Sequence, residues 1–270
     1  MNLNDLRMVL EWARDEGWNP GIEDASAFLA ADPKGFYLAE VKGDIVAAIS
    51  VVNHDANNAF LGLFICRPEF RGLGFGKALW DEAMLHAGGR SVMLEGVPEQ
   101  QGNYAKSGFV SIGKTVRYCG VIPGGDVGGP TLSDEGIDRL IKVDEVSNGY
   151  PRAAYLSEWF KPTPSRKTIL LGTDPDRLAY ATFRKCAEGV KVGPFQAFDR
   201  DQATALLRSR PFVSGSEITF IDIPEKSKAL TDLVVEMGFK PVFETAKMVK
   251  GSPAMTQFPP YSAVASLELG

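Results

Sequence analysis

The first 120 residues combine helical and strand-like patterns of apolar positions. Apolar residues recur at helical spacing at Leu6, Val9, Leu10 and Ala13, and the stretch IEDASAFLAAD predicts a second short helix. Three β-branched and aromatic runs follow, separated by the turns KGD and HDANN, and they predict an antiparallel meander: GFYLAEV, IVAAISVV and AFLGLFIC. A helix, a strand (SVMLEGV), a short helix (QQGNYAKSG) and a strand (VSIGKTVRYCG) follow. The predicted order over residues 1 to about 119 is therefore ααβββαβαβ.

A dense cluster of chain breakers separates this pattern from a second one. The stretch GVIPGGDVGGPTLSD holds five glycines and two prolines in fifteen residues, which predicts a linker at 122–134 between domains at 1–121 and 135–270. The second part repeats the order of elements, and the pair Gly-Phe ends a late helix in both, at Gly108 and at Gly238. We interpret the chain as a diverged tandem duplication of one α+β fold with a mixed sheet.

Composition and charge exclude several classes of protein. A net charge of −5 and a pI near 5.3 argue against a general nucleic-acid binder. Acidic residues interrupt the N-terminal apolar pattern, so it predicts an amphipathic helix rather than a signal peptide, and no apolar run is long enough to span a membrane. The cysteines Cys66, Cys119 and Cys186 form no CxxC pair, so we expect no metal site, no disulfide framework and a cytoplasmic protein.

A glycine-rich loop precedes the third predicted helix. In RPEFRGLGFGKALW, Gly72, Gly74 and Gly76 alternate with other residues between Arg71 and Lys77. Glycine lets the backbone approach a ligand closely, and several N–H groups ahead of a helix N-terminus favour an anion, most often phosphate. An ordinary tight turn is the alternative interpretation of the same glycines.

Two other phosphate motifs are excluded by spacing. A P-loop requires a glycine at the position of Arg71 and a hydroxyl at that of Ala78. The dinucleotide fingerprint requires a third glycine where Lys77 stands, and it follows a βαβ unit rather than a meander.

Two motifs together, RGLGFG and NYAKSGF, resemble the GNAT superfamily of acyl-CoA N-acetyltransferases. The resemblance implies two tandem three-layer α/β/α domains with predominantly antiparallel mixed sheets, and acetyl-CoA as the cosubstrate with no metal. It implies the following CoA-binding residues: Arg71, Gly72, Leu73, Gly74, Phe75, Gly76 and Lys77 at the pyrophosphate, and Phe64, Ile65 and Cys66 along the pantetheine. A packing role is the alternative for the Cys66 side chain. Val97 replaces an asparagine common in the family, and Asn103 is the nearby candidate for that contact.

The resemblance also implies the catalytic residues. Tyr104 corresponds to the tyrosine that protonates the CoA thiolate, although a tyrosine here could simply pack the helix on the sheet. Glu95, in the strand SVMLEGV, is the first candidate for the base that deprotonates the acceptor amine, and a solvent-facing strand residue is the alternative. His54 is expected in a solvated loop, and His86 is expected to stabilise a helix C-terminus. Acceptor contacts are expected from Glu16, Trp18 and Asn19.

The second part lacks the features of a CoA site. Asp199 and Asp201 place negative charge at the position of the glycine loop, and Val234 stands where Tyr104 stands in the first part. We therefore expect a degenerate domain that covers the acceptor side of the first. Its aromatic residues are expected in the core: Tyr150, Tyr155, Trp159 and Phe160. Arg152 is expected to pair with an acceptor carboxylate, or with Asp144 or Glu145.

The function expected from the sequence is acetyl-CoA-dependent N-acetylation of a primary amine on a small molecule, by direct attack in a ternary complex. The oxyanion would then meet a backbone amide near Ile65 or Cys66. A non-catalytic CoA-binding sensor and a protein lysine or N-terminal acetyltransferase are the alternatives. We expect a monomer or homodimer with neither nucleic-acid nor membrane partners.

Overall fold

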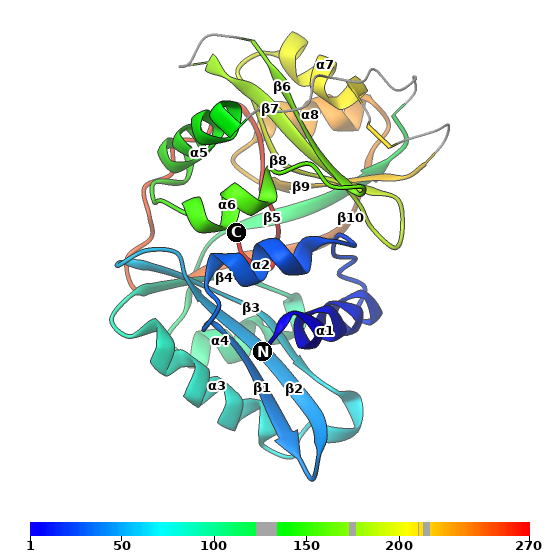
Figure 1. Ribbon diagram of the computed structural model, residues 1–270. Coiled ribbons are helices and arrows are strands. Elements are labelled where there is room, and N and C mark those ends of the chain that lie inside the picture. Colours follow the sequence, from blue (N-terminus) through cyan, green and yellow to red (C-terminus); the bar gives the residue numbers. More distant parts are fainter. Residues whose placement is uncertain (123–133, 173–176, 210, 213–216) are drawn as a thin grey trace.

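The computed structural model of the chain describes residues 1–122, 134–172, 177–209, 211–212 and 217–270 (Figure 1). The first half contains α1 (Leu3–Asp15), α2 (Asp24–Ala31), β1 (Phe36–Val41), β2 (Asp44–Asn53), β3 (Asn58–Cys66), α3 (Phe75–Ala87), β4 (Ser91–Gly96), α4 (Gln101–Lys106) and β5 (Val110–Gly120). The second half contains α5 (Asp134–Asn148), α6 (Ala153–Trp159), β6 (Arg166–Leu171), β7 (Ala179–Lys185), β8 (Val190–Ala197), α7 (Arg200–Ser209), β9 (Thr219–Pro224), α8 (Lys228–Glu236), β10 (Lys240–Lys250) and β11 (Tyr261–Ala263).

Both halves follow the predicted order of elements, and the predicted mixed α/β fold class is confirmed. The strand β11 was not predicted, because its three residues are too short to show a period. Apart from its two end residues, the predicted linker at 122–134 falls on 123–133, outside the described residues. The division into two domains at this linker stays a prediction.

The strands of both halves join in one 11-stranded sheet in which the last strands of the halves are exchanged. The order is β1-β2-β3-β4-β10-β5-β9-β8-β7-β6, and β11 pairs with β8. β10 lies between β4 and β5, and β5 lies between β10 and β9, so each half completes the sheet of the other. Thr115 of β5 pairs with Thr245 of β10, and the same offset of 130 residues relates Gly108 to Gly238. The pseudo-twofold axis of the duplication therefore passes between the two threonines.

Helices cover both faces of the sheet. On one face α1, α2, α5 and α6 share a single hydrophobic core that spans both halves, with α2 and α6 side by side at the centre of Figure 1. On the opposite face α3 and α4 pack on β2 to β4, while α7 and α8 pack on β7 to β9. The aromatic residues expected in the core, Tyr150, Tyr155, Trp159 and Phe160, are all buried.

Residues 261–270, which we call the C-terminal segment, run from the second half into the first. β11 pairs with β8, and the segment then crosses the sheet at Gly193 of β8 and at Gly62 of β3. The two glycines are not 130 residues apart, but each directly follows the part of its strand that pairs in parallel with the next strand. A Cβ on Gly193 would lie 2.1 Å from the Val264 carbonyl oxygen, and a Cβ on Gly62 would lie 2.0 Å from the Glu268 carbonyl oxygen. Only glycine permits this approach at either crossing.

Candidate active site

The strands β3 and β4 diverge in the middle of the sheet. They pair in parallel only where Asn58–Leu61 meet Ser91–Leu94, and the two strands then separate. A β-bulge in β3 begins at this point, where Leu63 adopts a φ of 48°. Beyond it, β3 still pairs with β2, and β4 pairs with β10. The edge of β3 that faces β4 is therefore left open to an extended ligand, which could add to the sheet as a strand would.

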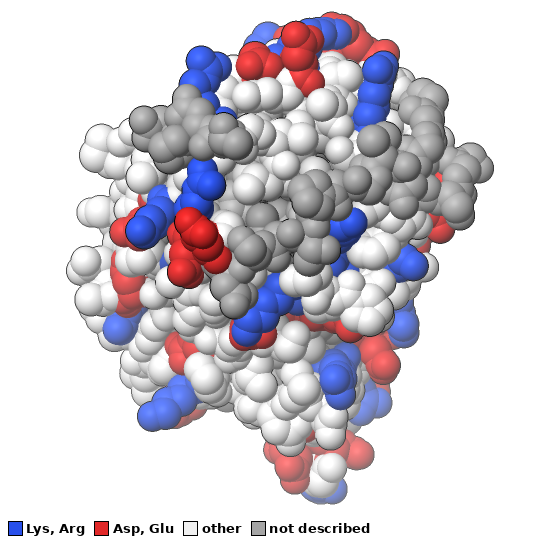
Figure 2. Space-filling model, turned by 45° about the horizontal axis from the view of Figure 1, so that its top comes forward, with Lys and Arg blue, Asp and Glu red and all other residues white. Residues whose placement is uncertain are grey.

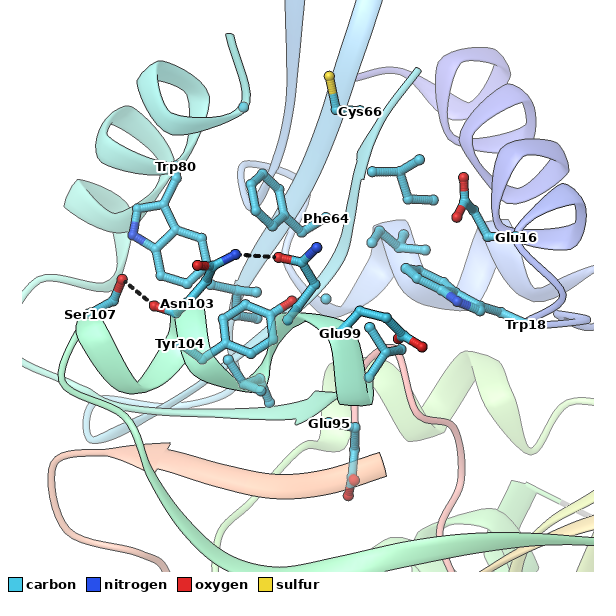
Figure 3. A pocket seen from close by; sticks show the side chains of 18 of the residues that line it. Glu16, Trp18, Phe64, Cys66, Trp80, Glu95, Glu99, Asn103, Tyr104 and Ser107 are labelled. Carbon is cyan, nitrogen blue, oxygen red and sulfur yellow. Dashed lines mark hydrogen bonds between the residues drawn. The ribbon is translucent and has the colours of Figure 1, made fainter. Parts of the chain in front are cut away.

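A cavity of ≈ 910 Å³ occupies this gap (Figure 3). Its volume is in the range of small-molecule binding sites. The strand edge, the glycine loop and α4 supply most of the lining from the first half, and the second half adds four residues. The lining includes Glu16, Trp18, Leu61, Gly62, Leu63, Phe64, Ile65, Cys66, Arg71, Gly72, Gly74, Gly76, Lys77, Trp80, Glu95, Asn103, Tyr104, Phe243, Thr245, Leu267 and Glu268.

The glycine loop ends in the N-terminus of α3. Gly72 and Gly74 have φ values of 76° and 88°, a region that residues with a Cβ rarely adopt, and Gly74 is the N-cap. The first hydrogen bond of the helix runs from the Ala78 N–H to the Gly74 carbonyl, at 3.0 Å. The preceding N–H groups of α3 therefore have no partner in the helix and can bind an anion.

The charged side chains of this loop are held by neighbouring residues. Arg71 donates from Nε to the Cys66 carbonyl at 2.8 Å and forms an ion pair with Glu16. Lys77 forms an ion pair with Asp81 one turn along α3. Both cations lie in the cavity lining, and these carboxylates partly offset their charges.

Two residues of the loop lie outside the cavity lining. The Leu73 side chain is exposed to solvent. The Phe75 ring packs on Phe70, with 6.2 Å between ring centroids. A role for these two residues at a CoA pyrophosphate is therefore limited to their backbone.

Tyr104 combines the packing role and the catalytic role that the sequence left open. Its ring stacks on Trp80 at 5.8 Å and meets Phe109 at an angle, so the residue joins α4 to the sheet. Figure 3 shows its hydroxyl pointing toward the cavity. Burial raises the pKa of Tyr104 to about 12, which keeps the phenol protonated at neutral pH. Beside it, Asn103 lines the cavity and donates to Gln100 Oε1 at 2.9 Å.

Glu95 lies at the floor of the cavity, and both of its carboxylate oxygens accept hydrogen bonds. Thr115 donates to Oε1 at 2.9 Å, and Thr245 donates to Oε2 at 2.6 Å. Lys247 lies directly opposite on β10. Burial raises the pKa of Glu95, although Lys247 and the two hydroxyls act in the other direction. A carboxylate whose pKa is raised is a stronger base than an ordinary glutamate, as a proton acceptor requires.

Of the four residues expected to contact the acceptor, two line the cavity and two do not. Glu16 and Trp18 line the cavity. Asn19 is buried outside the lining, where its amide donates to the Glu188 carbonyl at 2.8 Å. Arg152 is also buried away from the cavity, and it pairs with both oxygens of Asp144 at 2.7 and 2.8 Å. Asn19 and Arg152 thus tie segments of the chain together, so placing Asn19 at the acceptor was wrong, and of the partners considered for Arg152 the structure confirms Asp144.

Neither histidine reaches the cavity lining. His54 is not solvated as expected: it bonds to the Leu269 carbonyl at 3.0 Å and packs beside Tyr150. His86 lies in the last turn of α3, and its Nε2 is 2.6 Å from Asp32 Oδ2. Both histidines have structural partners in the fold.

The sequence did not reveal the residues that the second half contributes. Phe243 and Thr245 come from β10, and Leu267 and Glu268 come from the C-terminal segment. The offset of 130 residues relates Thr245 to Thr115 and could have indicated β10. Nothing in the sequence indicated that Glu268 lines a site, except that it is an acidic residue among the mostly apolar last residues of the chain.

The corresponding gap of the second half is filled by the chain itself. β8 and β9 pair only where Val190–Val192 meet Thr219–Ile221, as β3 and β4 do in the first half. Beyond that point β11 pairs with Phe195–Ala197 of β8, along the edge that stays open in β3. The second half therefore has no open strand edge at this place, which is a stronger obstacle to CoA than the acidic residues noted in the sequence.

Several other classes of site are not indicated. In the part of the chain that the structure describes, no group of His, Cys, Asp and Glu side chains is arranged to hold a metal ion. No described helix is long and apolar enough to cross a membrane. In the described part of the face seen in Figure 2, basic and acidic side chains are interspersed rather than gathered into one basic patch.

Comparison with known proteins matches both halves of the chain. A profile described as "Acetyltransferase (GNAT) family" matches residues 4–109, and one described as "Acetyltransferase (GNAT) domain" matches residues 140–258. Holothin acyltransferase from Pseudoalteromonas sp. (strain SANK 73390) is 33% identical over 276 residues, which cover 100% of this chain and 92% of the relative.

Solved structures show the same fold. A proposed acetyltransferase from Pyrococcus horikoshii superposes with a TM-score of 0.80 at 20% identity, covering 100% of this chain and 94% of that chain. A tandem GNAT protein from the clavulanic acid biosynthesis pathway superposes with a TM-score of 0.59 at 16% identity, covering 95% and 98%.

Proposed function

The chain belongs to the GNAT acetyltransferase family and is an acyltransferase, and we propose that it transfers an acetyl group from acetyl-CoA to a primary amine of a small molecule. The observation that carries the proposal is one cavity that brings together an open strand edge, a helix N-terminus and the Tyr104 hydroxyl. These are the groups that a pantetheine, a pyrophosphate and a departing thiolate require.

The first half has a suitable group for each part of acetyl-CoA. The unpaired N–H groups at the start of α3 would bind the pyrophosphate, with Arg71 and Lys77 within reach of it. The edge of β3 from Phe64 to Cys66 would hydrogen-bond with the amides of the pantetheine. Asn103 is available at the opposite wall of the cavity.

The reaction follows from the remaining groups. The amine loses a proton to Glu95, directly or through a water, and its nitrogen attacks the thioester carbonyl carbon. A backbone N–H near Ile65 or Cys66 stabilises the negative oxygen of the tetrahedral intermediate. The C–S bond then breaks, and the thiolate takes the proton of the Tyr104 hydroxyl to leave as CoA. The nitrogen loses its second proton as the amide forms, and this proton restores the Tyr104 hydroxyl.

Two observations favour a small acceptor over a protein. β10 and the C-terminal segment wall the cavity from the second half, so an acceptor must enter a pocket rather than dock on an open groove. The relative that matches over the full length of this chain is named for acyl transfer to holothin. A protein lysine that is acetylated faster than any free amine would overturn this part of the proposal.

The experiment that tests the function separates binding from turnover. We expect calorimetry to show one acetyl-CoA site in the wild type, and we expect Gly74→Asp to abolish it by placing a carboxylate at the helix N-terminus. Tyr104→Phe should bind acetyl-CoA normally and lose about 100- to 10,000-fold in turnover. Tyr118→Phe, which removes a hydroxyl from β5 outside the cavity lining, is the matched control.

The same experiment distinguishes the alternatives. Normal turnover by Tyr104→Phe would refute the acid role of this residue. Tight acetyl-CoA binding with no turnover of any amine or protein would favour the sensor. Failure of the wild type to bind acetyl-CoA would refute both the enzyme and the sensor.

A further inference from the structure

The C-terminal segment places a buried carboxylate in the wall of the cavity. Glu268 is only 4% exposed, yet it lies in the lining together with Glu95 and Trp18. Its Oε1 is buried, and no described residue donates a hydrogen bond to it. A buried carboxylate without a donor is costly, so this carboxylate gains stability when a ligand in the cavity donates a hydrogen bond to it.

The segment that carries Glu268 is fixed on both sides of it. The Leu269 N–H donates to Ser266 Oγ at 3.0 Å, and the Leu269 carbonyl accepts from His54 at 3.0 Å. The Ala265 carbonyl accepts from Arg184 at 2.9 Å. Gly62 lets the Glu268 backbone lie directly against β3. The backbone that carries the carboxylate is therefore held by partners from both halves and is not a free tail.

The cations near Glu268 are engaged with other groups. Arg117 binds both oxygens of Asp222 at 2.7 and 2.9 Å and donates to the Trp18 carbonyl. Lys191 is buried and donates to the same carbonyl at 3.0 Å. Arg184, a third buried cation that interacts with the charge of Glu268, is paired with Asp24. None of the three cations forms an ion pair with Glu268 within the described residues, so they offset its charge from a distance and leave its oxygens without a hydrogen-bond donor.

The lining is polarised between its two ends. The cations in it come from the glycine loop and α4: Arg71, Lys77 and Lys106. The side formed by β10 and the C-terminal segment offers Glu268, Phe243 and Leu267, with Glu95 and Trp18 beside them, and none of the described lining residues from these two elements is a Lys or Arg. Arg71 extends toward this side only as far as its ion pair with Glu16. This side therefore suits a cationic, partly apolar group and repels a carboxylate.

We propose that Glu268 binds the acceptor as its ammonium and selects amines that carry an apolar or aromatic portion but no carboxylate. This inference rests on the proposed function and names its substrate class. The Glu268 carboxylate holds the ammonium by a charge-assisted hydrogen bond, while Glu95 remains the proton acceptor. The second half thus contributes the acceptor-binding residue to the site of the first.

The test uses matched pairs of amines with and without a carboxylate. The pairs are tyramine and tyrosine, 2-phenylethylamine and phenylalanine, and tryptamine and tryptophan. We expect the wild type to bind the amine of a pair at least tenfold more tightly than the amino acid, by calorimetry with CoA present. The same preference is expected in kcat/KM where turnover occurs.

Glu268→Gln keeps the shape of the side chain and removes its charge. It should weaken amine binding by about 10- to 100-fold, mainly through KM, and should leave acetyl-CoA affinity unchanged. The preference within each pair should shrink. Glu244→Gln, which removes a carboxylate from the exposed face of β10, is the matched control and should change neither quantity.

Each outcome decides the inference separately from the proposed function. Amino acids that bind as well as their amines, amines that bind Glu268→Gln as tightly as the wild type, or no binding of any amine in the panel would each overturn it. Failure of the wild type to bind acetyl-CoA would instead overturn the proposed function.

Discussion

The turn between β2 and β3 holds a histidine whose burial makes the fold sensitive to acid. His54 contacts the Leu269 carbonyl and lies 5.5 and 6.4 Å from the rings of Tyr150 and Tyr155. Burial, and then the positive charge of Arg152, lower the pKa of His54 from 6.5 to about 4. The ring is thus neutral in the folded protein throughout the physiological range.

The sign and the size of the effect follow from linkage. Above pH 6.5 the ring is neutral in the folded and the unfolded chain, and it adds no pH dependence. As the pH falls from 6.5 toward 4, the unfolded chain binds a proton that the folded chain does not, so the free energy of unfolding decreases. The gap of about 2.5 between the two pKa values corresponds to about 3 kcal/mol in full, most of it lost by pH 4.5.

The assay compares the wild type with His54→Gln, whose amide can still donate to the Leu269 carbonyl. Urea unfolding at pH 7.5 should find the variant less stable by about 1 kcal/mol, because its packing against the tyrosines is poorer. At pH 4.5 the wild type should have lost about 2 kcal/mol relative to the variant, so the order of stability should reverse. A stability difference that stays the same at both pH values would refute the reasoning.

Substitutions at three other residues should have distinct effects on the pH profile, on amine binding and on stability. Thr245→Val removes a hydrogen bond that lowers the pKa of Glu95, so the acidic limb of the kcat/KM profile should move to higher pH; an unmoved limb would argue against Glu95 as the base. In Gly62→Ala the new Cβ would meet a carbonyl of the C-terminal segment at 2.0 Å, so amine KM should rise far more than acetyl-CoA Kd, and equal changes would contradict the crossing. Asp222→Asn leaves the buried charge of Arg117 uncompensated and should cost about 3–5 kcal/mol in urea unfolding, whereas a cost below about 1 kcal/mol would show that water reaches the pair.

The sequence predicted the local elements well because their signals are local. Alternating and helical apolar periods identified the elements of both halves in the correct order. The positive φ values of Gly72 and Gly74 and the helix that follows them are encoded within a few residues. Tyr104 could be placed in the cavity lining from the sequence because the motif NYAKSGF is also a local feature.

The sequence could not predict contacts that depend on pairing between distant strands. The apolar pattern of β10 does not show whether this strand pairs with a strand of its own half or with β4. The strand exchange was therefore missed, and so were Thr245 and Lys247, which the exchange places beside Glu95. Asn19 was assigned to the acceptor because of its loop, but its amide pairs with a turn of the second half. The role of Glu268 depends on where the C-terminal segment crosses β3, which no local pattern specifies.

The exchange of β5 and β10 has a consequence for how such a chain can evolve. The duplication produced two copies, and one of them lost its open strand edge to β11. That copy cannot be discarded, because β4 would lose its neighbour and β5 would lose β9. Separating residues 1–120 from residues 135–270 would leave β4 and β5 in one fragment, and β9 and β10 in the other, without neighbours that they have in the intact sheet. Inheritance therefore treats the two copies as one unit, and the copy without an open strand edge persists because its last strand is built into the sheet of the other.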